Sequence, residues 1–177
     1  MNLAEYTDVE SILQAQFDTS DILSAEQAIR FASGDIRGWT GQHIAPPQDD
    51  VYEEHVVRAS RVFLPHPPTI PVTVTTVELD DVVVDAADWR LDRHNVVVSE
   101  SGTWTGKLTV TYTHGFDDPP EDVVAVCVKL ALRVLSNPVS HQSIKLEGFS
   151  ATWGTGDENT DVKLLSRLDR YRMTGVG

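Results

Sequence analysis

The apolar positions near the start of the chain repeat with the period of a helix. Within residues 6–17, Thr7 and Glu10 have the spacing of a capping box. Apolar side chains recur there at intervals of three and four: Val9, Ile12, Leu13 and Phe17. The pattern predicts a first helix that buries one face.

A second helical pattern follows in residues 24–38. Ser24 and Gln27 again have capping-box spacing, and Gly38 stands where helices commonly end. One face carries mostly small side chains: Ala25, Ala28, Ile29, Ala32 and Ile36. Because small side chains let helices approach closely, we expect two N-terminal helices, within residues 1–45, that pack together.

The pattern then changes to that of β-strands. Short runs rich in Val and Thr fill residues 70–114, separated by turn-forming pairs such as Asp80-Asp81 and Ser101-Gly102. Such closely spaced runs favour antiparallel pairing, because parallel crossovers need about a dozen residues or more. Residues 51–64 suit either a short helix or two strands, and their Val and Phe content favours strands. We therefore expect a β region over residues 50–114.

The stretch after the β region carries the signals of a buried helix. Pro119 and Pro120, with two acidic residues behind them, suit a helix start, and the "SNP" at residues 136–138 ends the pattern. The residues between are apolar on more than one face, and Cys127 among them is expected to be a small buried hydrophobe. This predicts a central helix over residues 119–136.

Residues 144–177 are expected to form an extended arm followed by a terminal helix. Its apolar stripe has helical spacing: Leu164, Leu165, Leu168 and Tyr171. The stripe suits docking onto another subunit as well as packing on its own core. The pieces fit one domain over residues 1–177. Its expected fold class is α+β, with a helical core, an antiparallel β-sheet insertion and a C-terminal arm and helix.

Charge narrows the range of functions. The 177 residues hold 14 basic and 27 acidic side chains, for a formal net charge of −13. This argues against general affinity for nucleic acid, which depends on Lys and Arg neutralising phosphates.

One cysteine excludes an internal disulfide and a cysteine-based zinc site. With no signal peptide and no apolar stretch of about 20 residues, we expect a soluble intracellular protein without a membrane partner.

Candidate catalytic residues are few. His114 lies close to Asp117 and Asp118, which permits a general acid–base arrangement, but adjacent acids in a turn are more often turn formers. The six histidines have no metal-binding spacing, and no phosphate-binding loop or nucleophile elbow is present. The sequence therefore predicts no catalytic residue, no metal site and no cofactor.

Several segments, taken in order, resemble one protein family. They are "GWTGQHIAPP" after the two N-terminal helices, "RVFLPHPPTIPVTVTTVELDD", "KLTVTYTHGFDDPPEDVVAVCVKLALRVLSNP", "EGFSATW" and "LLSRLDRYR". Together they cover nearly the whole chain. They resemble the head-to-tail adaptor (connector) proteins of bacteriophages with long, non-contractile tails. The family's glycine-rich turn before "LP" is replaced here by "RAS".

The resemblance implies a structural virion protein at the capsid–tail junction, assembled in the host cytoplasm. It implies a ring, usually a dodecamer, between the portal protein and a stopper or tail-terminator protein. Genome DNA would pass through this channel without sequence-specific binding. The terminal segment becomes the expected portal-docking element: Leu164, Leu165, Leu168, Arg170, Tyr171 and Arg172. The loop "SESGTW", with Trp104, is expected to contact neighbouring subunits or the tail side.

Two alternatives remain open on the residues alone. One is a small intracellular enzyme that uses His114 with Asp117 or Asp118. The other is a generic, non-viral protein-binding module. The acidic charge favours the virion component, because a negatively charged channel lets DNA slide without sticking.

Overall fold

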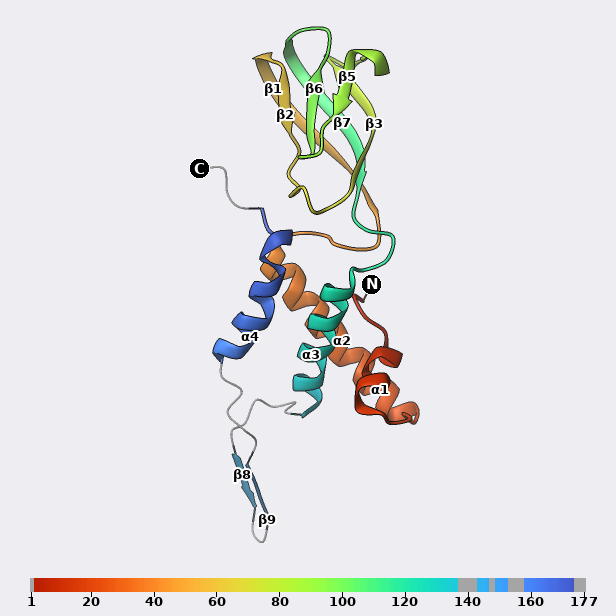
Figure 1. Cartoon of the computed structure of the whole chain (residues 1–177), viewed down its shortest axis with the longest axis vertical. Coiled ribbons are helices and arrows are strands. Elements are labelled where there is room, and N and C mark those ends of the chain that lie inside the picture. Colours follow the sequence, from red (N-terminus) through yellow and green to blue (C-terminus); the bar gives the residue numbers. More distant parts are fainter. Residues whose placement is uncertain (1, 137–142, 147–148, 153–157, 174–177) are drawn as a thin grey trace. The chain divides into compact units, whose positions relative to one another are not determined.

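The computed structural model describes residues 2–136, 143–146, 149–152 and 158–173. The chain divides into two compact units (Figure 1). The helical unit comprises residues 1–40 and 119–169, and the β unit comprises residues 41–118 and 170–177.

The helical unit is built around two long helices. α2 (Thr19–Thr40) packs against α3 (Glu121–Ser136), α1 (Tyr6–Leu13) contacts both, and α4 (Glu158–Leu165) contacts α3. All five predicted small or apolar residues of the α2 stripe are buried, so the small side chains do serve close packing. An ion pair between Arg133 and Asp161 joins α3 to α4.

The starts of the first two helices differ from the prediction. The capping box of α1 uses Glu5 and Asp8 rather than Thr7 and Glu10. α2 begins five residues earlier than Ser24, because the Asp18 carboxylate accepts hydrogen bonds from the backbone N–H groups of Ser20 and Asp21, at 2.7 and 2.9 Å. These bonds satisfy the exposed donors of a helix start. Together with a hydrogen bond from the Ser20 hydroxyl, which has the largest effect, they lower the pKa of Asp18.

Gly38 does not end α2, which continues to Thr40. The predicted apolar face of the first helix is also only partly buried. Val9 is fully buried, whereas Ile12 and Leu13 are 54% and 49% exposed. The helical spacing was correct, but nothing in the described part of the chain covers that part of α1.

The central helix ends where the sequence predicted and begins two residues later than the predicted start at residue 119. α3 starts after Pro119 and Pro120 with Glu121 and Asp122 in its first turn, and it ends at Ser136. Its inner faces are buried at Val123, Val126, Cys127, Val128, Leu130 and Ala131. The Cys127 thiol lies 3.5 Å from the Ser33 hydroxyl, and burial raises its pKa, which confirms an unreactive core residue.

The C-terminal region contains a hairpin and two short helices. β8 (Ser143–Leu146) pairs antiparallel with β9 (Phe149–Thr152), and the 3-10 helix η2 (Ser166–Tyr171) follows α4. Part of the expected extended arm, residues 147–148 and 153–157, lies outside the described residues, as does His141, one of the six histidines.

The β unit contains two antiparallel sheets (Figure 1). One has the order β1-β7-β3-β4, formed by β1 (Gln48–Ala59), β7 (Trp104–His114), β3 (Val72–Leu79) and β4 (Val82–Val83). The other has the order β2-β6-β5, formed by β2 (Arg61–Phe63), β6 (Val96–Ser99) and β5 (Trp89–Leu91), with the short helix η1 (Ala86–Asp88) before β5. The strand interpretation of residues 51–64 and the antiparallel pairing are confirmed. The order is not a simple meander, because β7 lies between β1 and β3.

The two sheets bury a common core. β7 alternates strictly, with buried residues at every second position from Trp104 to His114. Its inward side chains meet residues from β1, β2, β3 and β6, and the buried set is Val56, Val62, Leu64, Val77, Val97, Trp104, Leu108, Val110 and Tyr112. The β unit therefore has a hydrophobic core of its own.

The predicted turn at Asp80-Asp81 is a tight hairpin between β3 and β4. Both residues have positive φ, 50° and 63°, as a two-residue type I′ turn requires. The Asp80 carboxylate accepts a hydrogen bond from the backbone N–H of Lys107 at 2.9 Å, which brings it against Gly106. A Cβ at Gly106 would lie 2.4 Å from an Asp80 oxygen, and its φ of +135° is open only to glycine.

The expected architecture, a helical connector core with the sheet as an insertion, is wrong. The described residues form a mixed fold, mostly β-rich, with a smaller helical part of four α-helices. The physical reason is that the sheets bury their apolar faces against each other, so they do not depend on the helices for a core.

Candidate functional site

A cluster of polar side chains lies at one end of the sheet core in the β unit. Tyr112 and His114, the last two inward positions of β7, are buried. The neighbouring strand β1 places Asp50 opposite Tyr112, and the loop after β2 supplies His66. Strand register thus gathers residues that are up to 64 positions apart (50 against 114).

A chain of hydrogen bonds connects the cluster. His66 Nδ1 lies 2.7 Å from the Gln42 side-chain oxygen, and His66 Nε2 lies 3.1 Å from the Tyr112 hydroxyl. That hydroxyl also lies 3.4 Å from an Asp50 carboxylate oxygen, and its single proton can be donated either to this oxygen or to His66 Nε2. Since Gln42 Oε1 can only accept, His66 Nδ1 carries the proton and Nε2 has the lone pair.

His114 lies among the aromatic rings of the cluster, but the hydrogen-bond chain described above does not include it. Its ring stacks on that of His66, with centroids 3.9 Å apart and planes at 22°. His43 approaches edge-on, with its ring centroid at 6.1 Å, while its own Nε2 lies 2.7 Å from the Pro46 carbonyl oxygen. His114 Nδ1 is buried and has no partner within the described part of the chain. Such an atom costs about 1–3 kcal/mol if nothing satisfies it.

Burial controls the protonation of these groups. It lowers the pKa of His66 to about 4, helped by repulsion from His114 and opposed by Asp50. Burial also lowers the pKa of His114, with Asp50 opposing and His43 adding to the effect. The pKa of Tyr112 is raised by burial and by the Asp50 carboxylate. At neutral pH both histidines are therefore neutral, and Tyr112 keeps its proton.

One carboxylate oxygen of Asp50 and one ring nitrogen each of His66 and His114 lie within 4.8 Å of one another. Within the part of the chain that the structure describes, these three residues form the one group of side chains placed closely enough to hold a metal ion. The sequence does not predict this set, because neither histidine has a metal-binding neighbour along the chain. The only signal was the alternation that turns Tyr112 and His114 to the same face, and it says nothing about Asp50.

The catalytic arrangement considered from the sequence, His114 acting with Asp117 or Asp118, is not the one that the structure shows around His114. His114 is buried, while both aspartates are exposed in the turn that precedes α3. The carboxylate that acts on His114 is that of Asp50. The structure therefore places Asp117 and Asp118 as turn residues, and Gly115, with a φ of +110°, makes the corner.

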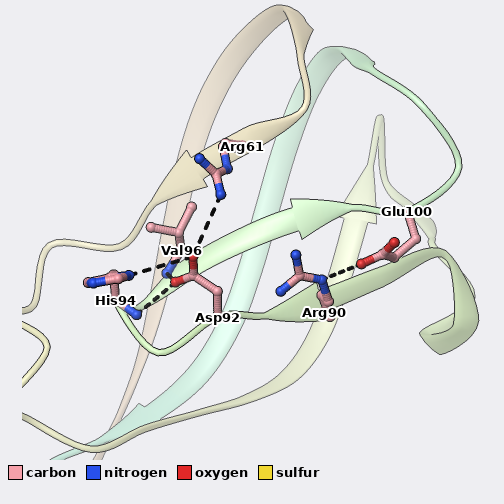
Figure 2. Close-up of polar contacts among 6 residues, drawn as sticks. All are labelled: Arg61, Arg90, Asp92, His94, Val96 and Glu100. Atoms are coloured by element: carbon pink, nitrogen blue, oxygen red, sulfur yellow. Dashed lines mark hydrogen bonds and ion pairs between the residues drawn. The ribbon is translucent and has the colours of Figure 1, made fainter.

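A second feature is an open groove of about 590 Å³ beside the turn between β5 and β6. Arg61, Arg90 and Arg93 line it, with Phe63 and His94. Figure 2 shows that two of the guanidinium groups point to carboxylates of the same unit: Arg61 pairs with Asp92 at 3.9 Å, and Arg90 pairs with Glu100.

Asp92 also organises the turn behind the groove. Its carboxylate accepts hydrogen bonds from the backbone N–H groups of His94 and Val96, at 2.7 and 3.3 Å (Figure 2). The bond from His94 makes the largest contribution to the lowered pKa of Asp92. Basic side chains line the groove, but two of its three arginines are paired with carboxylates. Such exposed ion pairs contribute little to stability.

The predicted portal-docking residues are divided between the two units. Leu164 and Leu165 are partly buried in the helical unit, and Leu168 is fully buried there. In the β unit Tyr171 is buried, with its ring 6.2 Å from that of Phe116, while Arg170 and Arg172 are exposed. The Arg170 guanidinium lies over the Tyr171 ring, and its backbone carbonyl accepts a hydrogen bond from the Thr69 hydroxyl at 2.6 Å. In this chain the apolar members of the segment face its own interior.

Trp104, expected at a subunit or tail-side contact, is also buried. It is only 4% exposed and belongs to the core between the two sheets. Its place at the first inward position of β7 explains this, because the alternation of the strand turns it toward the same face as Leu108.

No family model and no curated protein sequence matches this chain. Among the described residues, none of the helices has the length and apolar character that crossing a membrane requires. Function is therefore argued from the residues and their geometry.

Proposed function

We propose that this protein is a head-to-tail adaptor of a phage virion, a ring component between the portal and the next connector protein. The resemblance of five ordered segments motivates the proposal, and the structural observation that carries it is the exposed edge of the β unit. A ring needs a contact surface between copies of the chain.

β1 is the strand that supplies such an edge. It is 12 residues long and forms one border of the four-stranded sheet, where unpaired backbone groups can accept another strand. Val51 and Val57 are 54% and 71% exposed along it. A long edge strand with exposed valines favours contact with a second chain.

The helical unit has exposed apolar side chains as well. Ile12, Leu13, Leu23 and Phe31 are each about half exposed or more, at 54%, 49%, 62% and 55%. Ring contacts are heterologous, so each subunit must offer two different surfaces. The β1 edge and these α1 and α2 side chains supply two such surfaces. The net charge of −13 suits a channel through which DNA slides.

The test combines the protein with portal rings and follows assembly by sedimentation velocity and electron microscopy. The partner to use is a portal protein encoded in the same genome as this chain. We expect the wild-type chain to add a ring to the portal. The double variant Val51→Lys/Val57→Lys should lose ring formation, because two ammonium groups on the β1 edge oppose close packing.

The matched control adds the same charge elsewhere. Val82 and Val83 of β4 are 68% and 64% exposed and belong to neither proposed contact surface, so Val82→Lys/Val83→Lys should leave assembly intact. Rings that form equally well with the β1 variant would show that β1 is not the contact. A wild-type chain that never associates with portal rings, or a gene with no portal and capsid genes nearby, would overturn the adaptor proposal.

A further inference from the structure

The Asp50–His66–His114 cluster has the composition and spacing of a metal site. We propose that these three residues bind one divalent transition-metal ion of the zinc class. The inference stands on the β unit alone and is independent of the adaptor proposal.

The donor set fits this class of ion. Imidazole nitrogen and carboxylate oxygen are both ligands that Zn²⁺ takes in proteins, and three protein ligands leave a fourth position for water. The formal charges also suit it, because two neutral imidazoles and one carboxylate stabilise a divalent cation without excess negative charge.

The distances allow coordination after a small movement. Three donor atoms within 4.8 Å of one another place a central ion no more than about 2.8 Å from each, against zinc bonds of about 2.0–2.2 Å. Each side chain must therefore close in by less than an ångström. The stacked rings must also turn, since a metal ion lies in the plane of the imidazole that binds it and these planes are only 22° apart.

The surrounding residues already hold His66 in the tautomer that coordination needs. The Gln42 side-chain oxygen fixes the proton on His66 Nδ1, which leaves the Nε2 lone pair toward Tyr112 and Asp50. An outer partner on the second ring nitrogen is the usual support of a metal-binding histidine. Once a metal ion occupies the Nε2 lone pair, the Tyr112 hydroxyl is free to donate to the Asp50 carboxylate, 3.4 Å away.

A separate observation that supports a bound ion is the buried Nδ1 of His114, which has no hydrogen-bond partner among the described residues. The side chain is 4% exposed, its Nδ1 has no partner within the described residues, and its ring is held against His66. A buried polar atom left in this way calls for an explanation, and a bound ion is one of the accepted ones. By contrast, His55 and His94 are exposed and lack such surroundings.

The experiment uses the full chain, stripped of metal with EDTA and titrated with zinc sulfate at neutral pH by calorimetry. We expect one Zn²⁺ per chain and a higher Tm in its presence, since a ligand that binds the folded state stabilises it. Titration with Co²⁺ should give the visible absorption of a site with mixed nitrogen and oxygen ligands.

Three variants decide the assignment. Asp50→Asn and His114→Gln should each weaken Zn²⁺ binding at least about ten-fold, whereas His55→Gln on the exposed face of β1 should leave it unchanged. Asp50 is exposed, so Asp50→Asn keeps the test valid even if His114→Gln fails to fold. Absence of Zn²⁺ binding by the wild-type chain, or equal affinity in Asp50→Asn, overturns the proposal.

Discussion

At the residue scale, the clearest constraint is the close contact between Gly106 and the Asp80 carboxylate. Gly106 of β7 has a positive φ, and the tight turn that joins β3 to β4 places the Asp80 carboxylate against it. The sequence analysis identified the turn at Asp80-Asp81 but not its partner. That partner lies 26 residues away (80 against 106) and is reached only by the pairing of β3 with β7.

Gly106→Ala should therefore destabilise the protein by about 1–3 kcal/mol, because a side chain at this φ is strained and meets Asp80. Thermal or urea unfolding measures the effect. The matched control is Gly34→Ala within α2, where no atom lies within 4 Å of the added Cβ. That change should stabilise by up to about 1 kcal/mol, since alanine favours a helix. Equal effects at the two positions would contradict the strain at Gly106.

Also at the residue scale, the buried histidines predict sensitivity to acid. The pKa of His66 is about 6.5 in the unfolded chain and about 4 in the folded one. Below the unfolded value, the unfolded state binds more protons than the folded state. The stability contribution is thus complete above about pH 6.5 and is lost as the pH falls toward 4. The cost approaches the order of 3 kcal/mol at pH 4.

The measurement is urea unfolding of the metal-free protein between pH 7 and pH 4. The charged and titratable side chains that face the two buried rings are those of Asp50, His43 and Tyr112. His66→Gln should flatten the pH dependence, and His55→Gln, at an exposed position, should not. An unchanged slope in His66→Gln would show that the acid response comes from other groups.

At the scale of elements, the end of the chain shows how one helical stripe serves two units. Leu168 of η2 is fully buried in the helical unit, where Trp39 donates a hydrogen bond to Asp169 at 3.0 Å. Tyr171, three residues later, is buried in the β unit beside Phe116. From the sequence, the stripe could equally pack on the chain's own core or dock onto another subunit. In the structure, Leu168 and Tyr171 are both buried within the chain.

Leu168→Ala should accordingly lower the free energy of unfolding by about 2–5 kcal/mol, as for a leucine removed from a core. Arg167→Ala, at the exposed neighbouring position, should change it by less than about 0.5 kcal/mol. Chemical denaturation of both variants makes the comparison. A stable Leu168→Ala protein that no longer joins portal rings would instead favour the docking interpretation.

At the scale of the whole molecule, the sequence predicted element types better than their assembly. The positions of α3, of the small-residue stripe on α2 and of the strands in residues 51–64 follow from period, prolines and β-branched content, which act locally. The helical-core architecture was wrong because which faces bury each other depends on sheet order. Placing β7 between β1 and β3 gives the β unit its own core.

By itself, the sequence determined the local elements, the acidic charge and the inward alternation of β7, because these depend on neighbouring residues and composition. Only the tertiary structure decided that Trp104 and Leu168 are core residues, and that His66, His114 and Asp50 converge. These residues meet through strand pairing and a loop after β2, over separations that no local pattern encodes. The carboxylate beside His114 thus comes from another strand, and a metal titration tests what that arrangement binds.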